Sequence, residues 1–109
     1  MQQPVVRVGE WLVTPSINQI SRNGRQLTLE PRLIDLLVFF ARHPGEVFSR
    51  LALLEQVWGY QHEGYEHTVN THINRLRIKI EKDAAEPEII RTVWGKGYKF
   101  AEPQHDASL

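Results

Sequence analysis

Residues 67–82 carry side chains that could contact nucleic-acid bases, on one face of a segment with helical periodicity. Arg75 could donate two hydrogen bonds to a guanine, Asn74 could pair with an adenine, and the methyl groups of Thr71 and Ile78 could contact a thymine. The opposite face is an apolar stripe whose members recur at i, i+4, i+7 and i+11, namely Val69, Ile73, Leu76 and Ile80. A helix that buries this stripe turns its polar face outward, and an α-helix fits the major groove of DNA.

Basic residues gather in two segments, although the chain has 13 basic and 13 acidic residues and no net charge. Residues 67–82 contain four basic residues and one acid, and residues 91–99 contain three basic residues and no acid. His72, Arg77 and Lys79 lie on the flanks of the expected helix, where they could bind phosphates, which fix register without reading sequence. Such a segregated surface favours binding of a polyanion.

The second basic segment includes the run Trp94-Gly95-Lys96-Gly97, which we expect at the tip of a hairpin. Because glycine adds no side-chain bulk, the backbone beside Lys96 could approach a neighbouring minor groove closely. Trp94 is the tryptophan that we expect outside the core, whereas Trp11 and Trp58 are expected in the core or at its rim.

No arrangement of residues indicates catalysis, a metal or a cofactor. The chain has no cysteine, which excludes disulfides, thiolate zinc sites and cysteine nucleophiles. His62, His67 and His72 are spaced by five, whereas metal-binding pairs on a helix are spaced by four. Neither a Ser/His/Asp nor a paired-carboxylate arrangement is present, so we expect no enzymatic activity. A helix with an apolar stripe and a basic outer face is also often only a solvated helix, and that alternative stays open at this point.

The elements that must position these residues follow from periodicity and turn residues. Asn23-Gly24 predicts a tight hairpin because both residues accept positive φ, and Pro31 and Ser49 are expected to begin helices. No run is long and apolar enough for a membrane span, and the first residues do not resemble a signal peptide. The expected order is four strands within residues 5–29, helices over 31–42, 50–58 and 67–82, a loop over 59–66 after the second helix, a hairpin over 88–93 and 98–101, and a tail from 102.

Three separated motifs resemble those of the OmpR/PhoB family of transcription regulators and occur in the same order. The similarity extends over residues 5–101. The second motif resembles a "TV-x-x-HI-x-x-LR-x-K" recognition helix, and the third resembles a "TV-x-G-x-GY" wing. The motifs are Arg50 to Trp58, then Thr68-Val69-Asn70-Thr71-His72-Ile73-Asn74-Arg75-Leu76-Arg77-Ile78-Lys79, then Thr92-Val93-Trp94-Gly95-Lys96-Gly97-Tyr98.

The resemblance implies an α+β fold, a winged helix-turn-helix with an N-terminal four-stranded antiparallel sheet, a three-helix bundle and a C-terminal β-hairpin wing. This domain would occupy residues 1–103, with residues 104–109 as a tail or linker. The implied function is sequence-specific binding of double-stranded DNA, with recognition helix 67–82 in the major groove and wing 91–99 at the minor groove. The implied base-reading residues are Thr71, Asn74 and Arg75, the phosphate contacts are Arg50, Trp58, His67, His72, Arg77 and Lys79, and the wing contacts are Thr92, Trp94 and Lys96.

The resemblance also implies protein partners. The loop before the recognition helix resembles the segment that contacts RNA polymerase in this family, and it comprises Gly59, Tyr60, Gln61, His62, Glu63, Gly64, Tyr65 and Glu66. A weak homodimer on DNA is a further expectation. The alternative function is a winged helix that binds proteins, either polymerase or a sensory partner. An RNA-binding winged helix comes third, because no aromatic platform for base stacking is evident.

Two positions depart from the family pattern. His67 stands where arginine is frequent, which weakens a phosphate contact at pH 7, and Trp94 stands where some members place an arginine, so minor-groove reading rests on Lys96. Residues 1 to about 48 resemble CadC-like, membrane-integrated activators, whereas the remainder resembles the effector domain of a two-component response regulator. Natural divergence and a chimera both produce such a division, and we favour a chimera. The expected location is the cytoplasm, including the cytoplasmic side of a membrane-integrated regulator.

Overall fold

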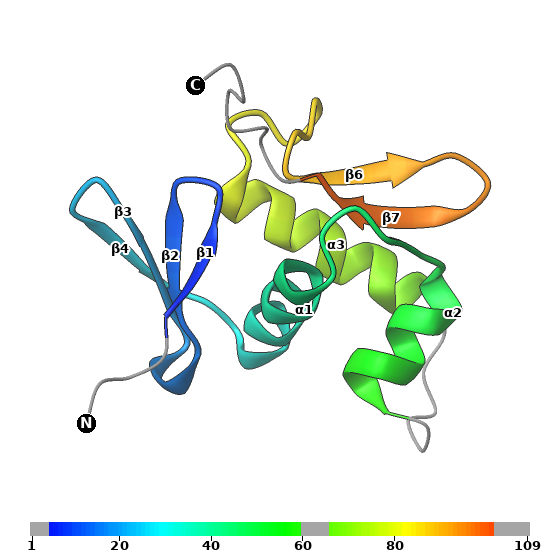
Figure 1. Cartoon of the computed structure of the whole chain (residues 1–109), viewed down its shortest axis with the longest axis horizontal. Coiled ribbons are helices and arrows are strands. Elements are labelled where there is room, and N and C mark those ends of the chain that lie inside the picture. The colour runs from blue at the N-terminus through cyan, green and yellow to red at the C-terminus, as the bar shows by residue number, and fades with distance from the viewer. Residues whose placement is uncertain (1–4, 60–65, 102–109) are drawn as a thin grey trace.

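A computed structural model describes residues 5–59 and 66–101 and places two antiparallel sheets on either side of a group of helices (Figure 1). The N-terminal sheet, blue to cyan in Figure 1, has four strands in sequential order, which confirms the prediction. The expected tail, residues 104–109, lies outside the described residues. The strands are β1 (Val6–Val8), β2 (Trp11–Thr14), β3 (Gln19–Arg22) and β4 (Arg25–Thr28), with a short 3₁₀ helix, η1 (Pro15–Ile17), between β2 and β3.

The hairpin between β3 and β4 turns at the predicted residues. Asn23 and Gly24 have φ angles of 52° and 77°, and Arg22 pairs with Arg25 across the turn. Positive φ at both central residues gives a two-residue turn whose twist matches that of the flanking strands. The local sequence therefore fixes the register of this hairpin.

Three helical segments follow, close to their expected bounds. Helix α1 (Pro31–Arg42) begins with proline as predicted. Helix α2 (Arg50–Leu53) is capped by Ser49, whose Oγ accepts a hydrogen bond of 3.0 Å from the backbone N–H of Ala52, and it continues as a π-helical turn, η2 (Leu54–Trp58). Helix α3 (Glu66–Ile80) begins one residue earlier and ends two residues earlier than predicted. The π-helical turn was not expected, because residues 50–58 were predicted as one regular helix.

The C-terminal wing is a three-stranded sheet. Strands β6 (Ile90–Val93) and β7 (Gly97–Phe100) form the predicted hairpin, drawn in orange at the upper right of Figure 1. The two-residue strand β5 (Val47–Phe48) pairs with the other edge of β7, which the sequence did not indicate. The carboxylate of Glu81 accepts hydrogen bonds from the backbone N–H groups of residues 88–90, at 2.8–3.0 Å, and so fixes the chain between α3 and β6.

A single cluster of buried apolar residues joins the N-terminal sheet, the helices and the wing. Trp11 is buried, as predicted, and its indole Nε1–H donates to the carbonyl oxygen of Ile80 at 3.0 Å. This bond ties the N-terminal sheet to the end of α3. The shared core and this bond therefore hold α3 in one place relative to both sheets.

Within residues 5–59 and 66–101, no helix has the length and apolar character needed to cross a membrane.

Candidate nucleic-acid interface

Helix α3 buries the predicted stripe and exposes the predicted base-reading face. Ile78, at the centre of the outer face, is 71% exposed. Thr71, Asn74 and Arg75 are also exposed. The four stripe residues are each 1% exposed or less, namely Val69, Ile73, Leu76 and Ile80. Burial of the stripe against the core thus sets the direction in which the polar face points.

Two side chains of α3 form hydrogen bonds within their own helix. The hydroxyl of Thr71 donates to the carbonyl oxygen of His67 at 3.2 Å, which leaves its methyl group and oxygen lone pairs for a ligand. The Nδ1 of His72 lies 2.8 Å from the carbonyl oxygen of Thr68, so Nδ1 carries the proton there. The His72 ring also packs edge-on against Trp58, with centroids 5.0 Å apart. Half-buried Trp58 thus lies at the rim of the core, as predicted, and supports this side of α3.

Arg77 does not lie on an exposed flank, and that prediction is wrong. Only 8% of the residue is exposed. Its Nε and Nη2 donate to the carbonyl oxygen of Ile90 at 3.0 and 2.8 Å, and Nη2 also donates to Oγ1 of Thr92 at 2.9 Å. The guanidinium carbon lies 5.3 Å from the centre of the Tyr98 ring. Arg77 therefore fastens strand β6 of the wing to α3, and its phosphate contact stays a prediction.

Burial affects the ionisation of Arg77. Desolvation lowers the pKa of its guanidinium below the ordinary value, while the nearby Tyr98 and Glu81 act in the opposite direction. Since arginine stays protonated in proteins, this group is a permanent buried cation held by neutral oxygens. Its hydrogen bonds to Ile90 and Thr92 are charge-assisted, which makes them stronger than bonds between neutral groups.

The wing presents its tip and keeps its base attached to α3. Trp94 is 90% exposed, which confirms its expected place outside the core. Lys96 is exposed, and its backbone N–H donates to the carbonyl oxygen of Val93 at 2.9 Å, closing the turn. The hydroxyl of Tyr98 donates to Oδ1 of Asn70 at 2.7 Å. Thr92, a predicted wing contact, already accepts a hydrogen bond from Arg77.

The start of α2 and the wing tip line a common groove, which brings together four of the predicted DNA contacts, namely Arg50, Thr92, Trp94 and Lys96. Glu66, at the start of α3, lies in the same groove and forms an ion pair with Arg50, at 3.3 Å. Lys79, exposed on α3, has no ion pair with any of the described residues. The charge of Arg50 at the groove is therefore offset by Glu66, whereas the charge of Lys79 is not offset by an ion pair with the described residues.

Arg75 is also paired with an acid. Its Nη1 lies 3.5 Å from Oε2 of Glu30, the residue immediately before α1. This pair was not predicted from the sequence, because the two residues are distant in the chain. This ion pair places an acid beside one of the predicted base-reading residues, so it affects how the Arg75 side chain is positioned and charged.

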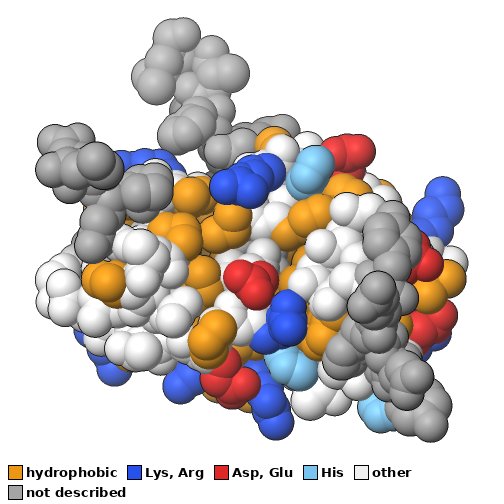
Figure 2. All heavy atoms as spheres, turned by 90° about the horizontal axis from the view of Figure 1, so that it is seen from below, with side chains coloured by type: hydrophobic (Ala, Val, Ile, Leu, Met, Phe, Trp, Pro, Cys, Tyr) orange, Lys and Arg blue, Asp and Glu red, His pale blue; other side chains and the backbone are white. Residues whose placement is uncertain are grey.

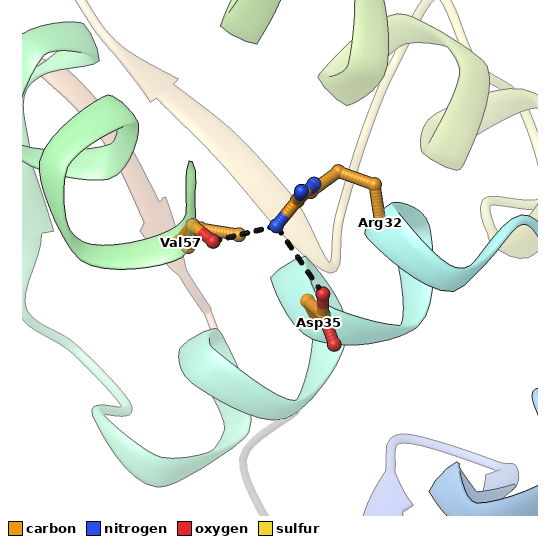
Figure 3. Close-up of polar contacts among 3 residues, drawn as sticks. All are labelled: Arg32, Asp35 and Val57. Carbon is orange, nitrogen blue, oxygen red and sulfur yellow. Dashed lines mark hydrogen bonds and ion pairs between the residues drawn. The ribbon is translucent and has the colours of Figure 1, made fainter. Parts of the chain in front are cut away.

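Arg32 fixes the end of η2, as Figure 3 shows. Its Nη1 donates to the carbonyl oxygen of Val57 at 2.7 Å and lies 3.5 Å from Oδ2 of Asp35, and its guanidinium lies 5.3 Å from the ring centre of Trp58.

Of the predicted polymerase-contact loop, Gly59 and Glu66 are described, while Tyr60, Gln61, His62, Glu63, Gly64 and Tyr65 lie outside the described residues.

Figure 2 shows one face of the molecule, seen from below the view of Figure 1. Acidic, basic and apolar side chains are interspersed on it, and the described side chains visible there form no continuous patch of lysine and arginine. A phosphate backbone requires such a cationic surface. The described side chains visible in Figure 2 therefore provide no such cationic surface on this face.

A helix with outward polar side chains, held by a helical bundle and flanked by a β-hairpin, defines a winged helix-turn-helix DNA-binding domain. The chain belongs to the family described as transcriptional regulatory protein, C terminal, which its residues 24–100 match and which has OmpR/PhoB-type DNA-binding domains as members. This agrees with the resemblance found in the sequence motifs.

The chain has relatives of both expected kinds, a CadC activator and a response regulator, and each matches nearly the whole chain. The chain is 62% identical over 104 residues to the transcriptional activator CadC of Escherichia coli, covering 94% of this chain and 20% of CadC. It is 43% identical over 99 residues to the DNA-binding response regulator MtrA of Mycolicibacterium smegmatis, covering 91% of this chain and 43% of MtrA. The chain thus spans less than half the length of either relative. The similarity to CadC continues past residue 48, and a chimeric origin stays a prediction.

Solved structures share the fold. The DNA-binding domain of E. coli CadC matches with a TM-score of 0.84 and 60% identity, covering 94% of this chain and 96% of that chain. The DNA-binding domain of Klebsiella pneumoniae RstA, solved in complex with the RstA box, matches with a TM-score of 0.78 and 33% identity, covering 91% of this chain and 98% of that one. The winged helix-turn-helix architecture predicted from the sequence is therefore confirmed.

Proposed function

We propose that the chain recognises a specific duplex sequence, with α3 in the major groove and the tip of the wing at the adjacent minor groove. The observation that carries this proposal is the division of α3 into a fully buried apolar stripe and an exposed face with Thr71, Asn74 and Arg75. In this position Arg75 would read a guanine and Asn74 an adenine, while the methyl group of Thr71 would contact a thymine.

Phosphate contacts would come from the edges of the interface. Arg50 and Lys96 border the groove between α2 and the wing, and Lys79 is exposed on α3. Trp58 and His72, a half-buried pair whose rings pack edge to face, are the predicted phosphate contacts at the junction of η2 and α3. The remaining predicted contacts are His67 and Arg77 on α3 and Thr92 and Trp94 on the wing. Such contacts supply affinity and register, and the base-reading face supplies the choice of sequence.

The proposal is tested by selecting bound sites from random duplexes and then measuring Arg75→Ala on the selected site. The variant should lose about 1–3 kcal/mol on the selected duplex and relax the preference at one base pair. Lys79→Ala is the matched control: it should weaken binding of all duplexes equally and reduce the slope of log affinity against log salt by about 1. An equal loss on every duplex for Arg75→Ala would place Arg75 on a phosphate and contradict the base-reading role.

We further propose that the loop from Gly59 to Glu66 contacts RNA polymerase in the cytoplasm, with residues 1–103 acting as one domain without catalytic activity. The ends of the loop support this proposal, because Arg32 holds Val57 on one side and Arg50 pairs with Glu66 on the other. Arg75→Glu should abolish duplex binding and leave polymerase binding unchanged in a pull-down with purified polymerase. Loss of both would mean that the two surfaces are not separate. A weak homodimer would appear as cooperative binding to tandem half-sites.

A further inference from the structure

Glu30 and Arg75 connect the start of α1 with the outward face of α3. Arg75 Nη1 lies 3.5 Å from Glu30 Oε2, and the two side chains are 52% and 57% exposed. Among residues 5–59 and 66–101, the Arg75 side chain forms no other ion pair or hydrogen bond. The position of this guanidinium in the free protein therefore depends on Glu30.

The backbone of Glu30 is fixed on both sides. Its carbonyl oxygen accepts hydrogen bonds from the backbone N–H groups of Leu33, at 2.9 Å, and Ile34, at 3.2 Å, which form the first turn of α1. Leu29 is buried directly before it, and Pro31 follows it with a restricted φ. The Glu30 side chain forms no capping hydrogen bond. Its carboxylate thus extends from a fixed backbone and is available to hold Arg75.

A guanidinium has five N–H donors, and the ion pair engages only Nη1. Arg75 can therefore keep Glu30 at Nη1 and still offer two further donors to the N7 and O6 atoms of a guanine. A phosphate makes a different demand, because its contact depends on net positive charge. The pair of Arg75 with Glu30 has no net charge. While the pair is intact, it therefore attracts a phosphate only weakly.

We propose that Glu30 is a specificity-determining residue: its carboxylate orients Arg75 toward a base and prevents Arg75 from serving as a general phosphate contact. This inference rests on the base-reading role of Arg75 in the proposed function. Glu30 acts through Arg75 and touches no DNA itself. Its effect is on the ratio of specific to non-specific affinity.

The test compares Glu30→Gln with the wild-type chain on the selected duplex and on a scrambled duplex, at several salt concentrations. The ratio of the two affinities should fall about twofold to fivefold, the range that an exposed ion pair supports. Most of the change should be a gain in non-specific affinity, and the salt slope for the scrambled duplex should steepen by about 0.9, since Arg75 becomes free to bind a phosphate. A role limited to stability would change neither quantity.

Glu10→Gln is the matched control, because it also removes one negative charge from an exposed carboxylate paired with an arginine, Arg22 at 4.0 Å. It should leave the affinity ratio unchanged. If Glu30→Gln fails to fold, Glu30→Asp replaces it: the shorter side chain keeps the charge and draws it away from Arg75, so the ratio should fall, with a smaller gain in non-specific affinity than removal of the charge would give.

A double-mutant cycle separates this inference from the proposed function. In an Arg75→Ala background, Glu30→Gln should no longer change the ratio. An unchanged ratio for Glu30→Gln alone, an equal effect of Glu10→Gln, or an effect that persists without Arg75 would each overturn the role of Glu30. If Arg75→Ala itself leaves the ratio unchanged, the base-reading role of Arg75 fails instead.

Discussion

Gly97, the first residue of β7, lies where the wing contacts the chain before α2. Its φ is +144°, a conformation that residues with a side chain rarely adopt. A Cβ atom at this position would overlap the carbonyl oxygen of Phe48 and lie 2.7 Å from its carbonyl carbon and 2.8 Å from Cα of Ser49. All three are backbone atoms, so no side-chain rotation relieves the overlap. We therefore predict that Gly97→Ala displaces β5 from β7.

The expected cost combines two effects. Insertion of a methyl group into a packed contact costs about 1–3 kcal/mol, and a side chain in a disfavoured backbone region adds about 1–3 kcal/mol. A loss of about 3 kcal/mol corresponds to a fall in Tm of about 12 °C or more for a domain of this size. Gly95→Ala is the matched control, since its φ is +76° and its Cβ would meet nothing within 4 Å. It should lose only about 1–2 kcal/mol.

Thermal unfolding followed by circular dichroism, with urea unfolding alongside, measures both variants. Gly97→Ala should unfold at a temperature clearly below that of Gly95→Ala, and it should also lose the part of DNA affinity that depends on the wing. Equal values of Tm for the two variants would refute the reasoning, because the overlap with Phe48 would then have no energetic consequence.

Two further stability changes follow from hydrogen bonds at the ends of the interface. Ser49→Ala should lower the free energy of unfolding by about 1 kcal/mol, because the N–H of Ala52 loses its capping oxygen; an unchanged urea midpoint would contradict this. Arg77→Met should cost about 2–4 kcal/mol, because it removes three charge-assisted hydrogen bonds to the wing and leaves the Ile90 carbonyl without them. Urea unfolding measures this loss as well, and a change below about 0.5 kcal/mol, the range of ordinary surface substitutions, would remove Arg77 from the attachment of the wing.

Features with a local cause were predictable from the sequence. Asn23-Gly24 determines its turn through backbone preferences, and the spacing of Val69 and Ile73 determines which face of α3 is buried. Ser49 satisfies a donor three residues away along the chain. Each depends on neighbours within a few residues, so the pattern alone indicates the outcome.

Features that depend on tertiary packing were not predictable in the same way. Strand β5 has only two residues and exists because β7 lies beside it. The pair of Glu30 with Arg75 joins segments far apart in the chain. Arg77 did carry a signal: it lies four residues after Ile73 and three before Ile80, which places it at the margin of the buried stripe. A basic residue at that margin can be a link between elements as well as a surface charge.

The bonds of Arg77 and Tyr98 hold the wing at a constant separation from α3. A duplex that receives both elements must fit its groove width and curvature to that separation, and the stiffness of DNA varies with base sequence. In the proposed binding mode, base steps that lie between the two contacts, and that neither element touches, would therefore contribute to the choice of operator through the energy needed to bend them.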